Sequence, residues 1–86
     1  MTIKDVQEQL FHILGLMEEG RNDATVECRL SNGDSVSFWY DTLHDALSFT
    51  GTKNWYEDSY ACIQDFMQYV DAHSLSVIQI VLQNRG

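Results

Sequence analysis

The sequence predicts a small α+β domain in which a three-stranded sheet packs on helices. The chain has 86 residues, a length typical of one domain, so we expect residues 1–86 to fold as a unit. Its 44% hydrophobic and 12% aromatic content argues against disorder. Two long stretches and one short one repeat apolar residues at helical spacing, and three others have the pattern of strands, which gives the order α-β-β-α-α-β. A β-hairpin and a C-terminal strand then form the sheet, with helices on one face.

The first helix is predicted over residues 3–19. Thr2 is a suitable N-cap, and Asp5 three residues later completes the capping pattern. Gly20 is a typical left-handed end of a helix, and residues 21–23 form a short connector. Its apolar face consists of Ile3, Val6, Leu10, Ile13, Leu14 and Met17.

A β-hairpin is predicted from residues 24–30 and 35–40. Val26, Cys28 and Leu30 alternate with polar residues, and so do Val36, Phe38 and Tyr40. A two-residue turn would put these two sets on opposite faces, whereas a three-residue turn over residues 31–33 puts them on the same face. We therefore expect the three-residue turn, with Gly33 in the left-handed bulge position.

A second, short helix is predicted to follow the hairpin. Asp41 or Thr42 would cap it, Asp45 would complete the capping pattern, and Gly51 would end it. Its narrow apolar face would consist of Leu43, Ala46 and Leu47.

The long helix over residues 54–70 is the predicted centre of the fold. Asn54 is its expected N-cap, with Glu57 at the third position. Its apolar face would consist of Trp55, Cys62, Ile63, Phe66, Met67 and Val70. Its outer face would carry Glu57, Asp58, Asp65 and Asp71 and no Lys or Arg. A face of one charge sign is either a solvated surface or a binding site for a basic partner.

The last strand is predicted over residues 75–82, with apolar residues on both faces. Ile78, Ile80 and Leu82 would join Val26 and Phe38 under the helices, whereas Leu75, Val77 and Val81 would point the other way, as Trp39 does. Either the first helix covers this second face, or the face is open to a partner or to a second copy of the chain, in which case Trp39, Val77 and Val81 would form the contact.

The charge balance limits the kinds of partner. Thirteen acidic and five scattered basic residues give a net charge of −8, which disfavours nucleic acids and anionic membranes and favours a basic or mixed protein surface. The apolar runs are too short to span a membrane. Cys28 and Cys62 are expected to be reduced core residues of a cytoplasmic protein, although a bridge between them stays open.

No motif in the sequence predicts catalysis, a metal site or a cofactor. His12, His44 and His73 do not stand at the spacing of a metal-binding pair, and there is no phosphate-binding glycine loop.

The function favoured by these observations is non-enzymatic protein binding, in the manner of a small acidic inhibitor, antitoxin or immunity protein. An alternative is a nucleic-acid mimic that blocks a nuclease, restriction or CRISPR complex, as anti-defence proteins of phages or mobile elements do. That alternative requires carboxylates to converge on one face from Glu18, Glu19, Asp23, Asp41, Asp45 and the long helix. A third hypothesis is a small enzyme with a site built from His12, His44 and a carboxylate.

Overall fold

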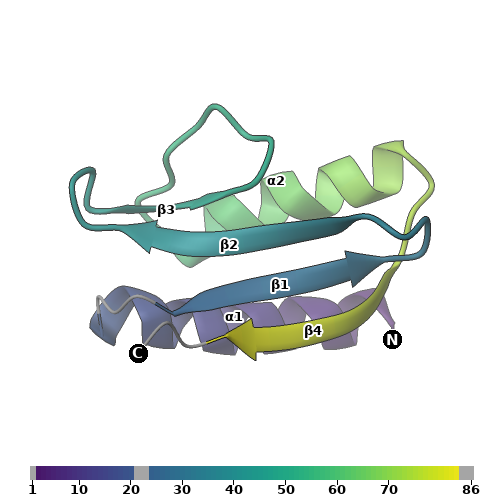
Figure 1. Cartoon of the computed structure of the whole chain (residues 1–86), viewed down its shortest axis with the longest axis horizontal. Coiled ribbons are helices and arrows are strands. Elements are labelled where there is room, and N and C mark those ends of the chain that lie inside the picture. Colours follow the sequence, from purple (N-terminus) through teal and green to yellow (C-terminus); the bar gives the residue numbers. More distant parts are fainter. Residues whose placement is uncertain (1, 21–23, 84–86) are drawn as a thin grey trace.

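The computed structural model describes residues 2–20 and 24–83 and contains two helices and one four-stranded sheet (Figure 1). The connector 21–23 and the polar tail from residue 84 onward lie outside the described residues. The elements follow in the order α1 (Ile3–Gly20), β1 (Thr25–Leu30), β2 (Ser35–Asp41), β3 (Ala46–Phe49), α2 (Ser59–Ala72) and β4 (Val77–Gln83). The α+β class is therefore confirmed, but the predicted three-stranded sheet and the order α-β-β-α-α-β are wrong.

The sheet is antiparallel, with the strand order β3-β2-β1-β4. Figure 1 shows both helices behind the sheet, α1 behind β1 and β4, and α2 behind β2. Both helices contribute buried residues to one core, together with the sheet residues that face them. The described residues form two layers, and neither α1 nor α2 lies over the other face of the sheet (Figure 1).

The core lies between the helices and the sheet, and Phe38 and Phe66 are its largest fully buried side chains. Their rings meet edge to face, with centroids 4.9 Å apart. Phe49 joins them at 5.4 Å from Phe38. From α1 the buried residues are Val6, Leu10, Leu14 and Met17, which confirms most of the predicted apolar face.

The hairpin has the predicted register. Cys28 pairs with Val36, and Val26 pairs with Phe38. Gly33 has a φ of 92°, which is the left-handed conformation expected of the three-residue turn. The register therefore follows the rule that the alternating apolar residues of both strands share one buried face.

The predicted short helix is wrong, because its residues form a turn and the third strand, β3. Leu43 lies in the turn and is 89% exposed. Leu47 and Phe49 point into the core from β3, and Tyr40 pairs with Leu47. The apolar pattern of these residues is compatible with a helix or with a strand. Pairing with β2 favours the strand, because the backbone N–H and C=O groups of β2 and β3 then form hydrogen bonds with each other. Gly51, with a φ of 92°, lies in the turn after β3 and does not end a helix.

The long helix begins four to five residues later than predicted. Asp58 is its N-cap, and the Asp58 carboxylate accepts a hydrogen bond of 2.8 Å from the N–H of Ala61. The preceding segment is extended, since Tyr56 pairs with Leu47 of β3 through two backbone hydrogen bonds of 2.8 and 2.9 Å. Trp55 therefore lies outside the helix and is 44% exposed.

A bulge in β4 overturns the predicted position of Val77. Arg29 pairs with Gln79, but Leu30 pairs with Val77, so Ile78 is an extra residue in β4. The extra residue turns Val77 to the helix side, where it is 3% exposed. Val77 therefore belongs to the core and not to the second face of the sheet.

Candidate partner-binding surface

The face of the sheet that lies opposite the helices is the candidate surface, and it is called the open face below. Strand alternation and cross-strand pairing assign to it Thr25, Glu27, Arg29, Ser37, Trp39, Ser48, Gln79, Val81 and Gln83. Trp39 and Val81 are half-buried. Because β1 separates them, Trp39 and Val81 are on strands about 10 Å apart and do not form one continuous apolar patch.

Polar side chains of β1 and β4 fill the space between them with a chain of hydrogen bonds. Arg29 donates to Glu27 at 3.4 Å and to the side-chain oxygen of Gln79 at 3.1 Å. Gln83 donates to the other Glu27 oxygen at 3.2 Å and accepts from Thr25 at 3.5 Å. These bonds hold the side chains in place on the surface of the sheet.

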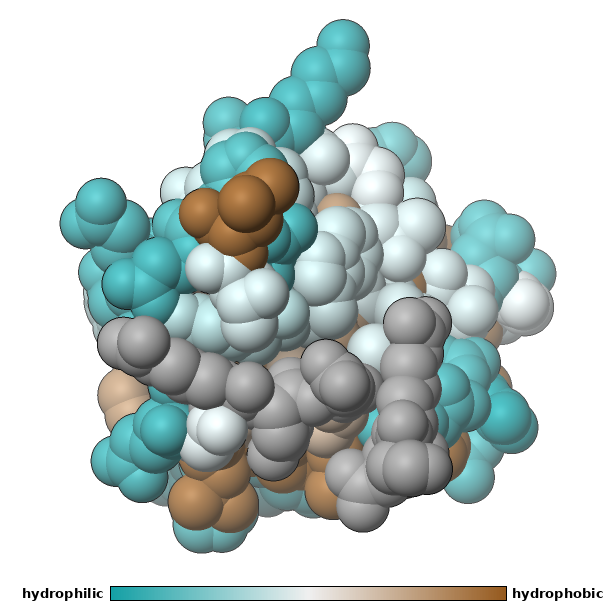
Figure 2. All heavy atoms as spheres, turned by 60° about the vertical axis from the view of Figure 1, so that its left-hand side comes forward, coloured by the Kyte–Doolittle hydropathy of each residue, from teal (hydrophilic) through white to brown (hydrophobic). Residues whose placement is uncertain are grey.

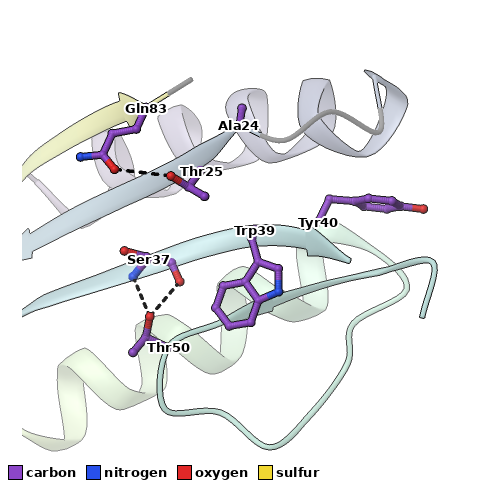
Figure 3. Close-up of a pocket in the computed structure, with 7 residues that line it drawn as sticks. All are labelled: Ala24, Thr25, Ser37, Trp39, Tyr40, Thr50 and Gln83. Atoms are coloured by element: carbon purple, nitrogen blue, oxygen red, sulfur yellow. Dashed lines mark hydrogen bonds between the residues drawn. The ribbon is translucent and has the colours of Figure 1, made fainter. Parts of the chain in front are cut away.

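Trp39 lies beside an open hollow of about 730 Å³. The hollow is lined by Ala24, Thr25, Ser37, Trp39, Tyr40, Thr50 and Gln83. Figure 3 shows the Trp39 ring standing out from β2, whereas Tyr40 points away from it. Thr50 is held to the backbone of Ser37 by two hydrogen bonds of 3.3 Å. The hollow therefore has one large apolar wall and several fixed polar groups.

The four acidic residues predicted for the outer face of the long helix do not form one row. Glu57 precedes α2, and Asp58 is its N-cap. Asp65 is half-buried and accepts a hydrogen bond of 2.8 Å from the Tyr56 hydroxyl. Asp71 lies at the other end of α2, about 20 Å of helix rise from Asp58. No Lys or Arg in the described part of the chain makes an ion pair with any of the four.

A second hollow brings carboxylates of three segments together and is called the acidic hollow below. It is lined by Glu18, Tyr40, His44, Asp45 and Glu57. The Tyr40 hydroxyl donates a hydrogen bond to Asp45. Figure 2 shows one face of the molecule, which is mainly hydrophilic with a few separate hydrophobic groups. Of the carboxylates predicted to converge, Glu18, Asp45 and Glu57 line this hollow, whereas Glu19 and Asp41 do not. Asp23 lies outside the described residues.

His44 is held at the rim of this hollow by two neighbours. Its ring stacks on Trp55 with centroids 3.8 Å apart and an angle of 9° between the planes. Its backbone N–H donates to the Asp41 carboxylate at 3.1 Å, which lowers the pKa of Asp41; the imidazole at 3.3 Å adds to this effect. This stack could not be predicted from the sequence, because it depends on the loop conformations of residues 42–45 and 50–58.

The other candidate catalytic groups stay apart. His12 is exposed on α1, and the ring of His73 is 3.0 Å from the Tyr69 carbonyl at the end of α2. Cys28 and Cys62 are free and fully buried, and burial raises the pKa of each thiol to about 12. Within residues 2–20 and 24–83, no three His, Cys, Asp or Glu side chains come close enough to hold a metal ion. No described helix has the length and hydrophobicity that crossing a membrane requires.

Comparison with known proteins adds no assignment: no family model, curated protein or solved structure matches this chain. The candidate surface therefore depends on its own geometry.

Proposed function

We propose that this protein is a non-enzymatic protein-binding module that contacts its partner through the open face of the sheet, with Trp39 as the central anchor. The observation that carries the proposal is a half-buried tryptophan on a sheet face that neither of the two described helices covers (Figure 1). Tryptophan is enriched among the residues that contribute most to binding energy in protein interfaces. The net charge of −8 favours a partner with a basic or mixed surface.

The polar groups of β1 and β4 on the open face support protein binding in a second way. Glu27, Arg29 and Gln83 already hold one another through hydrogen bonds, so a partner would meet side chains in fixed positions. Such preorganisation lowers the entropy that binding must remove. A module of this kind acts by covering the active or binding surface of its partner. We therefore propose an inhibitor, antitoxin or immunity-type role.

The acidic hollow favours a second candidate function, which is mimicry of nucleic-acid phosphates. Glu18, Asp45 and Glu57 line one hollow although they come from three segments. Two observations weigh against mimicry as the leading proposal: Asp71 lies at the far end of α2, and Asp65 is engaged by Tyr56. We therefore place the acidic hollow second and the open face first.

The test is capture of partners by the immobilised protein, comparing wild type with Trp39→Ala. We expect Trp39→Ala to weaken binding by at least about 2 kcal/mol, roughly 30-fold in Kd, as for an interface anchor. Trp55→Ala is the matched control, because Trp55 is also an accessible tryptophan but lies on a loop beside His44. Circular dichroism of each variant would establish that the fold is retained.

Salt dependence separates the two candidate functions. Binding through the open face should change little between low and high salt, whereas a phosphate mimic should lose affinity steeply as salt rises. Equal binding by wild type and Trp39→Ala would contradict the proposal. If the double variant Glu18→Gln, Glu57→Gln lost binding, and if the affinity of wild type fell steeply with salt, mimicry would be favoured.

A further inference from the structure

We propose that two copies of this chain associate through the free edge of β4, which would join their sheets into one eight-stranded antiparallel sheet. The two edges of the sheet are β3 and β4. An edge strand presents unpaired backbone N–H and C=O groups, and these can pair with a strand of another chain unless the protein protects them.

The β3 edge is protected. It has only four residues, all of them buried. Tyr56 closes it from outside with backbone hydrogen bonds to Leu47 in both directions, at 2.8 and 2.9 Å. Another chain cannot extend the sheet there without displacing this segment.

The β4 edge has almost none of the usual protection. It is seven residues long, and Figure 1 shows it as the lowest strand, with no further strand beyond it in the described part of the chain. It contains no charged residue and no proline, which are the residues that commonly prevent edge pairing. Its bulge at Ile78 lies near the start of the strand and leaves residues 79–83 in regular register.

The backbone pattern shows which residues point outward. The N–H of Leu30 donates to the Asp34 carbonyl at 2.8 Å, so even-numbered residues of β1 bond toward β2 and odd-numbered ones toward β4. Gln79 and Val81 pair with odd-numbered residues of β1. The backbone groups of Ile80 and Leu82, which alternate with them, therefore point to the free edge.

The side chains of β4 indicate that a second copy of this chain is the partner that best fits the free edge. Ile78 and Leu82 are 59% and 54% exposed, and Ile80 is half-buried. If Ile80 pairs with Ile80 of the second copy, Leu82 of each copy lies opposite the bulge residue Ile78 of the other. Such a contact has two-fold symmetry and places three apolar side chains of each copy in one row.

The distribution of charged residues also favours a second copy as the partner of the β4 edge. Two copies with a net charge of −8 repel each other over most of their surfaces. Residues 75–84 contain no charged side chain, so the β4 edge is a strip along which two copies can approach without placing like charges opposite each other. This two-fold arrangement leaves both open faces on the same side of the joined sheet, so the proposal is independent of the proposed function.

Sedimentation equilibrium tests the proposal directly. We expect wild type to be a dimer and Leu82→Glu to be a monomer, because the substitution places a charge opposite Ile78 of the other copy. The double variant Ile78→Lys, Leu82→Glu should be a dimer again, since each new lysine lies opposite a new glutamate and the net charge returns to −8. Both positions are exposed, and circular dichroism should show the same fold in all variants.

Trp39→Ala separates this dimer from one formed through the open face, and it should sediment as wild type does. A wild-type chain that stays monomeric at about 1 mM would overturn the proposal. At that concentration even a dimer with a Kd of about 1 mM would be substantially formed. So would a Leu82→Glu variant that stays dimeric, or a dimer that Trp39→Ala abolishes.

Discussion

At the scale of single residues, Tyr56 fixes the segment between β3 and α2. Its backbone pairs with Leu47, and its ring stacks on Phe49 with centroids 5.7 Å apart. Its hydroxyl accepts a hydrogen bond from Thr52 at 3.1 Å and donates one to Asp65 at 2.8 Å. Burial raises the pKa of Tyr56, and the bond to Asp65 acts in the same direction, while the bond from Thr52 opposes it. Tyr56 thus connects a loop, a strand and a helix.

We expect Tyr56→Phe to lower the free energy of unfolding by about 1.5 kcal/mol, the usual contribution of a hydrogen bond to a charged acceptor. The ring would keep its stack on Phe49, so the loss would report the hydroxyl alone. Urea unfolding followed by tryptophan fluorescence would measure it. Tyr60→Phe is the control, because Tyr60 is 62% exposed and should change stability by less than about 0.5 kcal/mol. Equal effects at both positions would show that the Tyr56 hydroxyl contributes nothing specific.

The sequence could not predict the bond between Tyr56 and Asp65. Helical periodicity places Asp65 on the outer face of the helix, as we predicted, but it cannot show that a tyrosine outside the helix reaches this carboxylate. For the same reason the sequence indicated a uniform acidic face, although Glu57 and Asp58 precede the first helical turn.

At the scale of elements, the turn of the β1–β2 hairpin is determined by one glycine. Gly33 has a φ of 92°, which is unfavourable for residues with a Cβ atom, but no heavy atom would lie within 4 Å of that Cβ. The need for glycine is therefore conformational and not steric.

We expect Gly33→Ala to lower the free energy of unfolding by about 1–2 kcal/mol, the cost of a left-handed conformation for an L-residue. Gly15→Ala is a matched control, since Gly15 lies inside α1 and a Cβ there would also meet no atom within 4 Å. In a helix the same substitution should stabilise by about 0.5–1 kcal/mol. Thermal unfolding of both variants would give opposite shifts in Tm; a gain of stability in Gly33→Ala would contradict the assigned turn.

Elements defined by local patterns were predicted well, and those defined by tertiary pairing were not. The spacing of Val6, Leu10 and Leu14 was sufficient for α1, and shared burial was sufficient for the hairpin register. The prediction was wrong for residues 41–58, because Asp41 and Asn54 are residue types that cap helices but have other roles in this structure. Asp41 accepts from the turn that leads into β3, and the Asn54 carbonyl accepts from Ser48. The Val77 error has a similar origin, since no local signal marks the bulge at Ile78.

At the scale of the whole molecule, the two-layer arrangement answers the question that the sequence left open. The apolar faces of α1 and α2 join one core on the same side of the sheet, so Trp39 is not covered by α1. Of the three residues predicted to share this face, Trp39 and Val81 lie on the open face and Val77 does not, and polar side chains of β1 separate the two that do. That polar interruption makes the surface mixed in character, as the proposed partner would require.

The net charge makes the proposed dimer sensitive to salt in an unusual direction. The molecule measures 33 × 24 × 20 Å, so at 0.01 M salt, where screening extends over about 30 Å, each copy experiences most of the charge of the other. At 0.15 M the screening length falls to about 8 Å, and the repulsion between two chains of −8 weakens. We therefore expect the dimer association constant, measured by sedimentation equilibrium, to rise as salt is added. The Ile78→Lys, Leu82→Glu dimer should gain less, because salt also screens its new ion pairs. A wild-type association constant that falls with salt would show that charged groups, and not the uncharged β4 edge, hold the two copies together.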